Sequence, residues 1–377
     1  MHELLHISAG CLIALILSAI TIPLVIRVSK QLNLFAEPNC RSATDLRVPT
    51  LGGISIFLGF ILGVTLNADE YFVRGTIYFI AAVLIMFFTG LKDDLVCLSA
   101  KKKLIVEIGV AAILIFLGNF RFTSLHGFLG IETIPYIPSV LLTSFVYIVI
   151  INAFNLIDGI DGLAAGLGIF SASIFGAWFF LTGHTEFSII SFSLVGALSG
   201  FFLYNVYGKK NKIFMGDTGS LVLGTIMAVL VIKFNEFNVD QTASYAIFAS
   251  PAVSFGILIY PLMDTIRVFS IRIVQKKSPF VADKNHTHHR LLALGWNHRQ
   301  ATWIILSVNA LFILAVVNLQ WIGIYWLMAF NILAGTGLLL LPAFFISSKN
   351  MIDDKDPHQK VILFSKRFME RKKKKME

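Results

Sequence analysis

Long apolar stretches, separated by short polar segments, run along the whole of this sequence. A helix that crosses the hydrocarbon core of a bilayer needs about 20 mainly apolar residues. Eleven stretches approach or reach that length, so the pattern predicts an all-α, polytopic membrane protein with about eleven transmembrane helices. The expected spans are 4–26, 51–67, 76–91, 104–118, 137–155, 163–182, 189–206, 219–236, 245–269, 302–319 and 322–346.

Composition supports a membrane protein and excludes several other classes. Of the 377 residues, 56% are hydrophobic and 14% are charged, whereas soluble domains have about 25% charged residues. The same numbers exclude disordered, collagen-like and disulfide-rich secreted proteins. Three pairs of glycines spaced four apart are expected to let helices pack closely. They are Gly59 and Gly63, Gly162 and Gly166, and Gly196 and Gly200.

The distribution of positive charge predicts the orientation in the membrane. Lys and Arg collect in short cytoplasmic loops. Of the 31 Lys and Arg residues, 28 fall in alternate connections that we assign to the cytoplasm and 3 fall in the others. We therefore expect an N-terminus outside and a C-terminus in the cytoplasm. We divide the chain into one integral membrane domain, 1–348, and a basic cytoplasmic tail, 349–377.

The basic tail accounts for much of the net charge of +9. It is expected to lie against anionic lipid headgroups. No aromatic platform accompanies it, so we do not expect a nucleic-acid partner.

Five aspartates fall at the predicted cytoplasmic ends of spans. Acids at membrane depth are costly and mark ion, substrate or proton sites. The alternative is that each carboxylate merely lies in the headgroup region, which would be the preferred interpretation for one isolated residue. Five on one side, beside the three lysines 101–103, favour a functional site. The aspartates are Asp93, Asp94, Asp158, Asp161 and Asp217.

The polar residues near 155 and 217 suggest a metal site. Asn155, Asp158 and Asp161 are three apart and are expected to lie along one helical face. The glycine-rich turn 216–220 leads into an apolar helix, and its backbone N–H groups would form a cradle for a phosphate or a metal–phosphate complex. Oxygen ligands of this kind suit Mg²⁺ or Mn²⁺ and not Zn²⁺.

A histidine cluster lies in a predicted cytoplasmic loop. His286, His288 and His289, followed by Arg290, are expected to recognise an anion such as a pyrophosphate. Zinc binding is the alternative because His-x-His is a common ligand spacing, but no Cys or Glu lies nearby. Arg47, at the start of the second span, would suit a lipid phosphate at the membrane surface.

Five motifs in this order resemble the polyprenyl-phosphate N-acetylhexosamine-1-phosphate transferases, which are glycosyltransferase family 4. The resemblance covers about residues 38–300. The motifs are Pro49…Gly52-Gly53, Asp93-Asp94, Asn152…Asn155…Asp158-Gly-Ile-Asp161-Gly, Gly216-Asp217-Thr-Gly-Ser220 and His286-Thr-His288-His289-Arg290.

The resemblance implies a reaction and a location. Such an enzyme transfers N-acetylhexosamine 1-phosphate from a UDP-sugar to undecaprenyl phosphate and releases UMP in the bacterial inner (cytoplasmic) membrane. This is the first membrane step of cell-envelope polysaccharide assembly, such as lipopolysaccharide or teichoic acid. Thr287 interrupts the histidine run and Arg290 follows it, which favours the N-acetylglucosamine branch over the MurNAc-pentapeptide branch.

The resemblance also implies roles for individual residues. Asp217 and Asn155 are expected to bind Mg²⁺, with Mn²⁺ as an alternative. Asp93, Asp94 and Lys103 are the expected catalytic residues; the aspartates would position the acceptor phosphate or Lys103, or else abstract a proton or attack covalently. A homodimer is one candidate assembly. The expected substrate-binding residues are Asp158, Asp161 on the nucleotide side, His286, His288, His289, Arg290 and Arg47.

Two other classes remain as alternatives. A secondary transporter or lipid flippase would place its acids near the bilayer midplane and often has repeated halves, whereas these acids are at the cytoplasmic ends and no halves repeat. The CDP-alcohol phosphotransferases also use membrane-embedded Asp and Mg²⁺, but their Asp-Gly…Ala-Arg run is absent here. The choice between direct and two-step displacement stays open.

Overall fold

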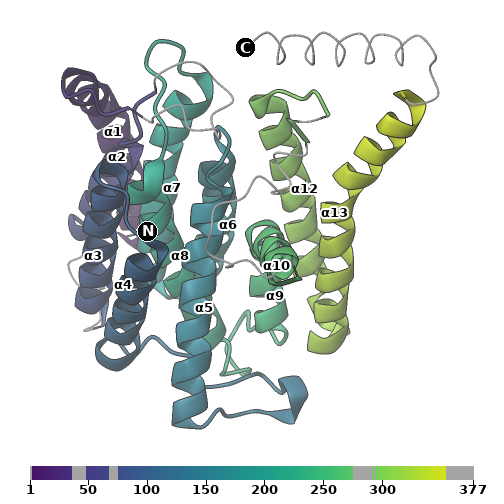
Figure 1. The fold of residues 1–377 in the computed structure, drawn as a ribbon. Coiled ribbons are helices and arrows are strands. Elements are labelled where there is room, and N and C mark those ends of the chain that lie inside the picture. The colour runs from purple at the N-terminus through teal and green to yellow at the C-terminus, as the bar shows by residue number, and fades with distance from the viewer. Residues whose placement is uncertain (1, 36–47, 68–74, 275–290, 293, 354–377) are drawn as a thin grey trace.

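The computed structural model describes residues 2–35, 48–67, 75–274, 291–292 and 294–353. The described residues form helices and no β-strand (Figure 1), which confirms the all-α fold class. The longer helices are α1 (His2–Gln31), α3 (Thr76–Leu95), α5 (Tyr136–Ile157), α6 (Leu163–Leu181), α7 (Thr185–Tyr207), α8 (Gly216–Phe237), α12 (His298–Asn318) and α13 (Ile324–Asp353). The shorter ones are α2 (Gly52–Thr65), α4 (Ala100–Ala112), η1 (Ile113–Leu117), η2 (Phe128–Gly130), α9 (Ser250–Ile257), α10 (Ile259–Val274) and η3 (Gln320–Ile322).

Seven of these helices are long and apolar enough to cross a membrane: α1, α3, α5, α6, α7, α8 and α12. The protein is therefore a multi-pass membrane protein. The pair α9–α10 adds an eighth candidate if it counts as one broken span.

The span expected at 245–269 differs from the structure. Two helices, α9 and α10, replace it and meet at 81°. Leu258 separates them with a non-helical ψ of 23°. Pro261 lies in the first turn of α10, where its ring would collide with the carbonyl of Ile257 in a continuous helix. A new helix therefore begins after Leu258.

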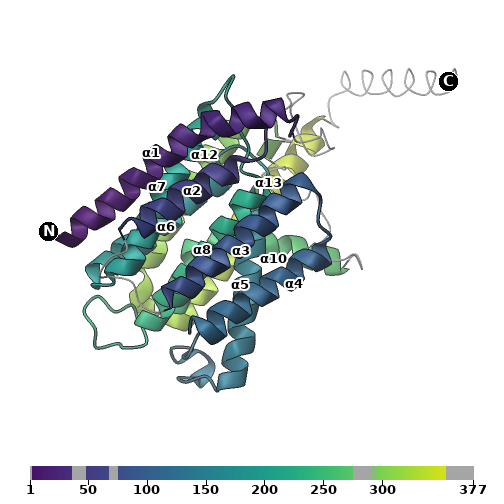
Figure 2. The same ribbon diagram turned by 90° about the vertical axis from the view of Figure 1, so that its left-hand side faces the viewer.

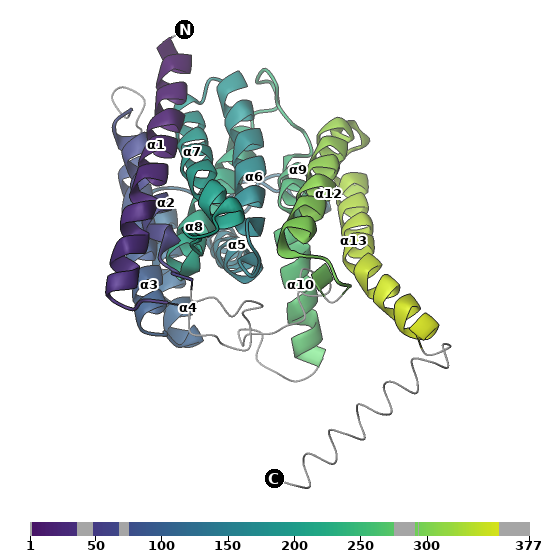
Figure 3. The same cartoon turned by 90° about the horizontal axis from the view of Figure 1, so that it is seen from above.

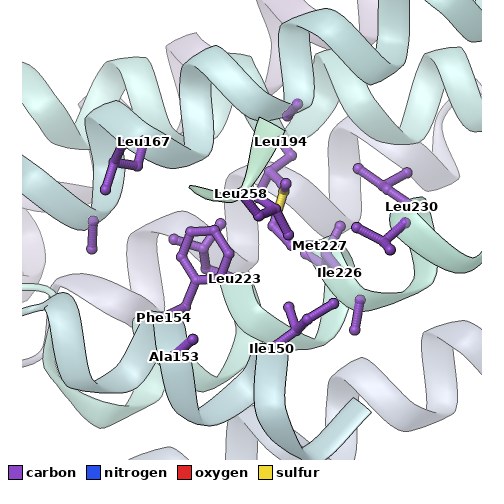
Figure 4. Packing of buried hydrophobic residues seen from close by; sticks show 14 of the residues in the cluster. Ile150, Ala153, Phe154, Leu167, Leu194, Leu223, Ile226, Met227, Leu230 and Leu258 are labelled. Atoms are coloured by element: carbon purple, nitrogen blue, oxygen red, sulfur yellow. The ribbon is translucent and has the colours of Figure 1, made fainter. Parts of the chain in front are cut away.

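Helix α8 forms the centre of the bundle and is the most deeply buried of the seven candidate spans. Figure 4 shows Leu223 of α8 beside Phe154 of α5, and Met227 of α8 near Leu194 of α7. All four side chains are fully buried. Packing on several sides fixes α8, and with it the polar residues at its first turn.

Helix α1 lies against α2 and α7 (Figures 2 and 3), and small residues allow this close approach. A Cβ on Gly59 would lie 2.6 Å from the carbonyl oxygen of Ala14, and one on Gly63 would lie 2.7 Å from that of Gly10. Gly196 and Gly200 contact the backbone of α1 in the same way. Helix packing, as predicted, is confirmed for these two pairs. In the third pair, Gly162 lies in a left-handed turn before α6 and not within a helix.

Candidate functional site

Asp94, in the last turn of α3, caps the N-terminus of α8. The backbone N–H of Asp217 donates to Asp94 Oδ1 at 2.8 Å, and that of Thr218 donates to Oδ2 at 2.9 Å. The Thr218 hydroxyl donates to the same Oδ2. The first N–H groups of a helix have no partner within the helix and attract negative charge. These two groups, predicted as part of a phosphate cradle, are therefore occupied by Asp94.

Two glycines make this capping contact sterically feasible. Gly216 has φ = +71°, and a Cβ there would overlap the carbonyl oxygen of Thr50 and lie 2.7 Å from both carboxylate oxygens of Asp94. A Cβ on Gly90 of α3 would lie 2.5 Å from the Cα of Thr218. Only glycine fits such close backbone approaches. The ends of α3 and α8 are therefore held in direct contact.

Lys103, in the first turn of α4, joins two carboxylates. Its ammonium contacts Asp93 Oδ2 and lies 3.3 Å from Asp217 Oδ1. Asn155, in the last turn of α5, donates from its amide nitrogen to Asp217 Oδ1 and, at 2.9 Å, to the Ser220 hydroxyl oxygen. Four helices thus bring together four predicted site residues, Asp93, Lys103, Asn155 and Asp217, in one cluster, with Asp94 beside it.

The cluster has the donor chemistry for Mg²⁺. The carboxylate of Asp217 and the amide of Asn155 supply hard oxygen donors, and Asp93 lies within hydrogen-bonding range of Asp217. The amide oxygen of Asn155 would have to exchange places with its nitrogen to face a cation. Among the described residues, no group of three or more His, Cys, Asp or Glu could hold a metal. Mg²⁺ requires no such group, since it is usually held by one or two carboxylates, with waters and substrate phosphates.

The expectation that Asn155, Asp158 and Asp161 share one helical face is wrong. Helix α5 ends at Ile157, and Asp158 follows it with a non-helical ψ of 50°. Gly162 precedes α6 with φ = +77°, a left-handed conformation that the sequence Gly-Ile-Asp-Gly permits. The two aspartates therefore belong to a turn between helices.

Asp158 lies close to the first turn of α8 and accepts a hydrogen bond from the backbone N–H of Gly216. Burial raises the pKa of Asp158 well above its usual value, and the negative charges of Asp217, Asp94 and Asp161 raise it further. The structure therefore places Asp158 against the cluster.

Asp161 forms a second polar group, with residues that sequence reasoning missed. Its Oδ2 accepts a hydrogen bond from Lys212 Nζ at 2.6 Å, and His298 Nδ1 lies 4.0 Å away. The Thr302 hydroxyl donates to the Asp161 carbonyl oxygen at 2.7 Å. These contacts join the α5–α6 turn to the α7–α8 loop and to α12. In the sequence, Lys212 is one of the positive charges that indicate orientation, and nothing in the pattern predicts its ion pair with Asp161.

A third buried contact was also missed. Glu107 of α4 is 2% exposed, and its carboxylate accepts a hydrogen bond at 2.6 Å from the amide nitrogen of Asn152. A lone acid inside an apolar stretch is a signal that could have found it. The contact ties α4, which carries Lys103, to α5, which carries Asn155.

Five of the predicted binding residues, Arg47, His286, His288, His289 and Arg290, lie outside the described residues. Their proposed roles stay predictions.

Comparison with known proteins identifies the family. Residues 76–235, from the start of α3 to the end of α8, match the family model "Glycosyl transferase family 4". The chain is 30% identical over 288 residues, 76% of each chain, to the undecaprenyl-phosphate alpha-N-acetylglucosaminyl 1-phosphate transferase of Escherichia coli O157:H7. It is 29% identical over 334 residues to the probable undecaprenyl-phosphate N-acetylglucosaminyl 1-phosphate transferase of Bacillus subtilis (strain 168), covering 86% of this chain and 89% of that protein. By this similarity, and with the aspartate cluster inside the matched region, the chain belongs to glycosyl transferase family 4.

Proposed function

We propose that this protein transfers N-acetylglucosamine 1-phosphate from UDP-N-acetylglucosamine to undecaprenyl phosphate and releases UMP. The names of its relatives support the acceptor and the transferred group. The observation that carries the proposal is the cluster of Asp93, Lys103, Asn155 and Asp217, which combines oxygen donors with a cation at one end of a membrane bundle. The reaction would be the first membrane step of cell-envelope polysaccharide assembly in the bacterial inner membrane.

We further propose eleven membrane segments with the cluster on the cytoplasmic side. The seven candidate spans, the bent pair α9–α10, the helices α2 and α13, and α4 continued by η1 correspond to the eleven predicted stretches. The bias of 28 of 31 Lys and Arg residues supports an N-terminus outside and a cytoplasmic C-terminus. A cysteine introduced at Lys210 tests this orientation, because an impermeant reagent should label it only in opened cells.

The chemical difficulty of the reaction lies in bringing two anions together. The acceptor phosphate monoester, with a second pKa of about 6, is mostly dianionic at neutral pH and needs little help from a base. We assign the attraction of this phosphate to Lys103, which Asp93 orients beside Asp217. Mg²⁺, or alternatively Mn²⁺, held by Asp217 and Asn155, would neutralise the donor pyrophosphate and stabilise the UMP leaving group.

The two adjacent aspartates receive different roles in this proposal. Both carboxylate oxygens of Asp94 are engaged by the first turn of α8, so we assign Asp94 to positioning Asp217. Asp93 contacts Lys103 and the backbone N–H of Leu98, so we assign it to orienting the cation. Neither assignment requires a covalent enzyme intermediate.

The remaining predicted residues are proposed to bind the two substrates. Asp158 and Asp161 lie beside the cluster, and we assign Asp161 to the nucleotide side. The predicted histidine loop, with Arg290, would bind the pyrophosphate, and Arg47 the lipid phosphate. A homodimer stays a prediction that a mass measurement of the purified protein would test.

An assay of purified protein tests the function directly. Incubation with undecaprenyl phosphate and UDP-N-acetylglucosamine should yield UMP and the lipid diphosphate sugar. EDTA should stop the reaction, and added Mg²⁺ should restore it. If no UMP forms while reconstituted vesicles accumulate or flip a substrate, the transporter interpretation replaces this one.

A further inference from the structure

A cavity lies at the end of the bundle opposite the aspartate cluster. Its volume is about 650 Å³, within the usual range for ligand sites. Residues from the start of α3, the end of η1, the α6–α7 turn and the end of α8 line it, and Glu3 of α1 contributes as well. None of the predicted site residues is among them, so the proposed transfer reaction leaves this cavity without a role.

Lys233 of α8 provides a cation within the lining. Its ammonium lies over three aromatic rings, 4.8 Å from the centre of Phe120, 5.2 Å from Phe237 and 5.5 Å from Phe187. In the part of the chain that the structure describes, no carboxylate forms an ion pair with it, although Glu186 and Glu236 attract it from nearby. Aromatic faces stabilise an ammonium group and leave its N–H donors available to a ligand.

The lining also provides a fixed negative charge. Glu186 is 5% exposed and accepts a hydrogen bond from the Thr76 hydroxyl. Burial and the charge of Lys233 lower the pKa of His184, so its ring, stacked on Phe237 at 3.5 Å, adds no positive charge at neutral pH. A simple anion would be attracted by Lys233 and repelled by Glu186. A ligand that carries both charges would be attracted at both places.

The depth of the cavity points to the lipid headgroup region. Lys233 follows Asp217 by 16 residues along α8. At 1.5 Å per residue this separates them by about 24 Å, which is close to the ~30 Å thickness of a bilayer core. If Asp217 lies at one membrane surface, Lys233 lies near the other.

We propose that this cavity binds the headgroup of a zwitterionic phospholipid, with Lys233 contacting the phosphodiester and Glu186 the ammonium. The bound headgroup would connect the ends of α3, α7 and α8. The opposite ends of α3 and α8 carry Asp94 and Asp217, so the lipid would stabilise the bundle without touching the substrates.

Lipid titration of the purified full-length protein tests the proposal. Phosphatidylethanolamine, phosphatidylglycerol and inorganic phosphate are each added to detergent-solubilised protein, and bound lipid is counted by native mass spectrometry while thermal unfolding is followed. We expect phosphatidylethanolamine to bind and raise the melting temperature, and phosphatidylglycerol to bind at least tenfold more weakly. Lys233→Met should lose the phosphatidylethanolamine effect at least tenfold. Lys101→Met, which removes an exposed charge at the other membrane side, should keep it.

A second variant separates the two charges. Glu186→Gln should reduce the preference for phosphatidylethanolamine over phosphatidylglycerol while keeping phosphatidylglycerol binding. Equal binding of phosphatidylethanolamine by Lys233→Met and the parent would overturn the proposal. An equal effect of inorganic phosphate would show a small-anion site instead, and an unchanged lipid preference in Glu186→Gln would refute the role of the carboxylate. UMP release, measured separately, reports the proposed function independently of these outcomes.

Discussion

Replacement of Asp94 by alanine removes the cap of α8. The carboxylate accepts three hydrogen bonds from Asp217 and Thr218, two of them from backbone N–H groups at 2.8 and 2.9 Å. Loss of an N-cap side chain costs about 0.5–2 kcal/mol, and loss of a partly buried charge at a helix N-terminus costs up to about 2 kcal/mol. We therefore expect Asp94→Ala to weaken the first turn of α8 by about 0.5–4 kcal/mol.

This weakening should appear in the placement of Asp217. Since 1.4 kcal/mol is a factor of ten, this loss corresponds to a change of about twofold to 1,000-fold. If Asp94 positions the proposed Mg²⁺ ligand, the Mg²⁺ concentration for half-maximal UMP release should rise within this range. The melting temperature should fall as well. Asp94→Asn keeps one carbonyl oxygen and should lie between Asp94→Ala and the parent protein.

Two threonines of α8 provide matched controls. Thr218→Val removes only the hydroxyl donor to Asp94 and leaves both backbone donors, so it should cost about 1 kcal/mol, or about fivefold. Thr225→Val removes a hydroxyl that donates to Leu221 within the same helix and should have less effect than Thr218→Val on Mg²⁺ dependence. An Asp94→Ala protein with an unchanged melting temperature and Mg²⁺ dependence, but a much lower kcat, would refute the positioning role and indicate direct catalysis.

Four further substitutions test the rest of the proposed site. Asp217→Ala should lower kcat by about a hundredfold or more while the protein stays folded, and turnover within a few-fold of the parent would contradict metal binding there. Lys103→Met should raise the KM for undecaprenyl phosphate more than Lys103→Arg does, whereas equal kinetics in the two variants would exclude a role for the charge. Lys212→Met should weaken UDP-sugar binding in a direct titration because Asp161 loses its 2.6 Å partner, and unchanged affinity would indicate a purely structural pair. His288→Ala should raise the donor KM, and unaltered donor binding would instead call for a zinc analysis.

Most of the fold could be predicted from the sequence because each helix that crosses a membrane needs a long apolar stretch, which is visible along the chain. Each expected apolar stretch contains or overlaps a helix, since lipid offers the backbone no other hydrogen-bond partners. The stretch 245–269 overlaps two helices that meet at 81°, whereas its apolar character predicts one straight span because hydrophobicity does not indicate a bend. The bend at Leu258 depends on the ring of Pro261. The hydrophobicity of the stretch gives no information about this steric effect.

The partners of the polar residues could be predicted less well. Lys212 pairs with Asp161 across 51 positions of sequence, and Glu107 with Asn152 across 45. Such contacts depend on which helix ends meet, and charge counting along the chain contains no information about that. The turn containing Asp158 was mistaken for helix because a three-residue spacing also fits a helical face, while Gly162 in a left-handed conformation ends the pattern.

The roles of Asp93 and Asp94 show why neighbours in sequence can act separately. Successive residues of an α-helix, at 3.6 per turn, point about 100° apart. At the end of α3, this rotation directs Asp93 toward Lys103 of α4 and Asp94 toward the first turn of α8. Two carboxylates that repel each other are thereby stabilised by different partners, one by an ammonium and one by helix N–H groups. Two adjacent residues of a sequence motif therefore need not act together. Replacement of Asp94 should change the placement of Asp217, whereas replacement of Asp93 should change the orientation of Lys103.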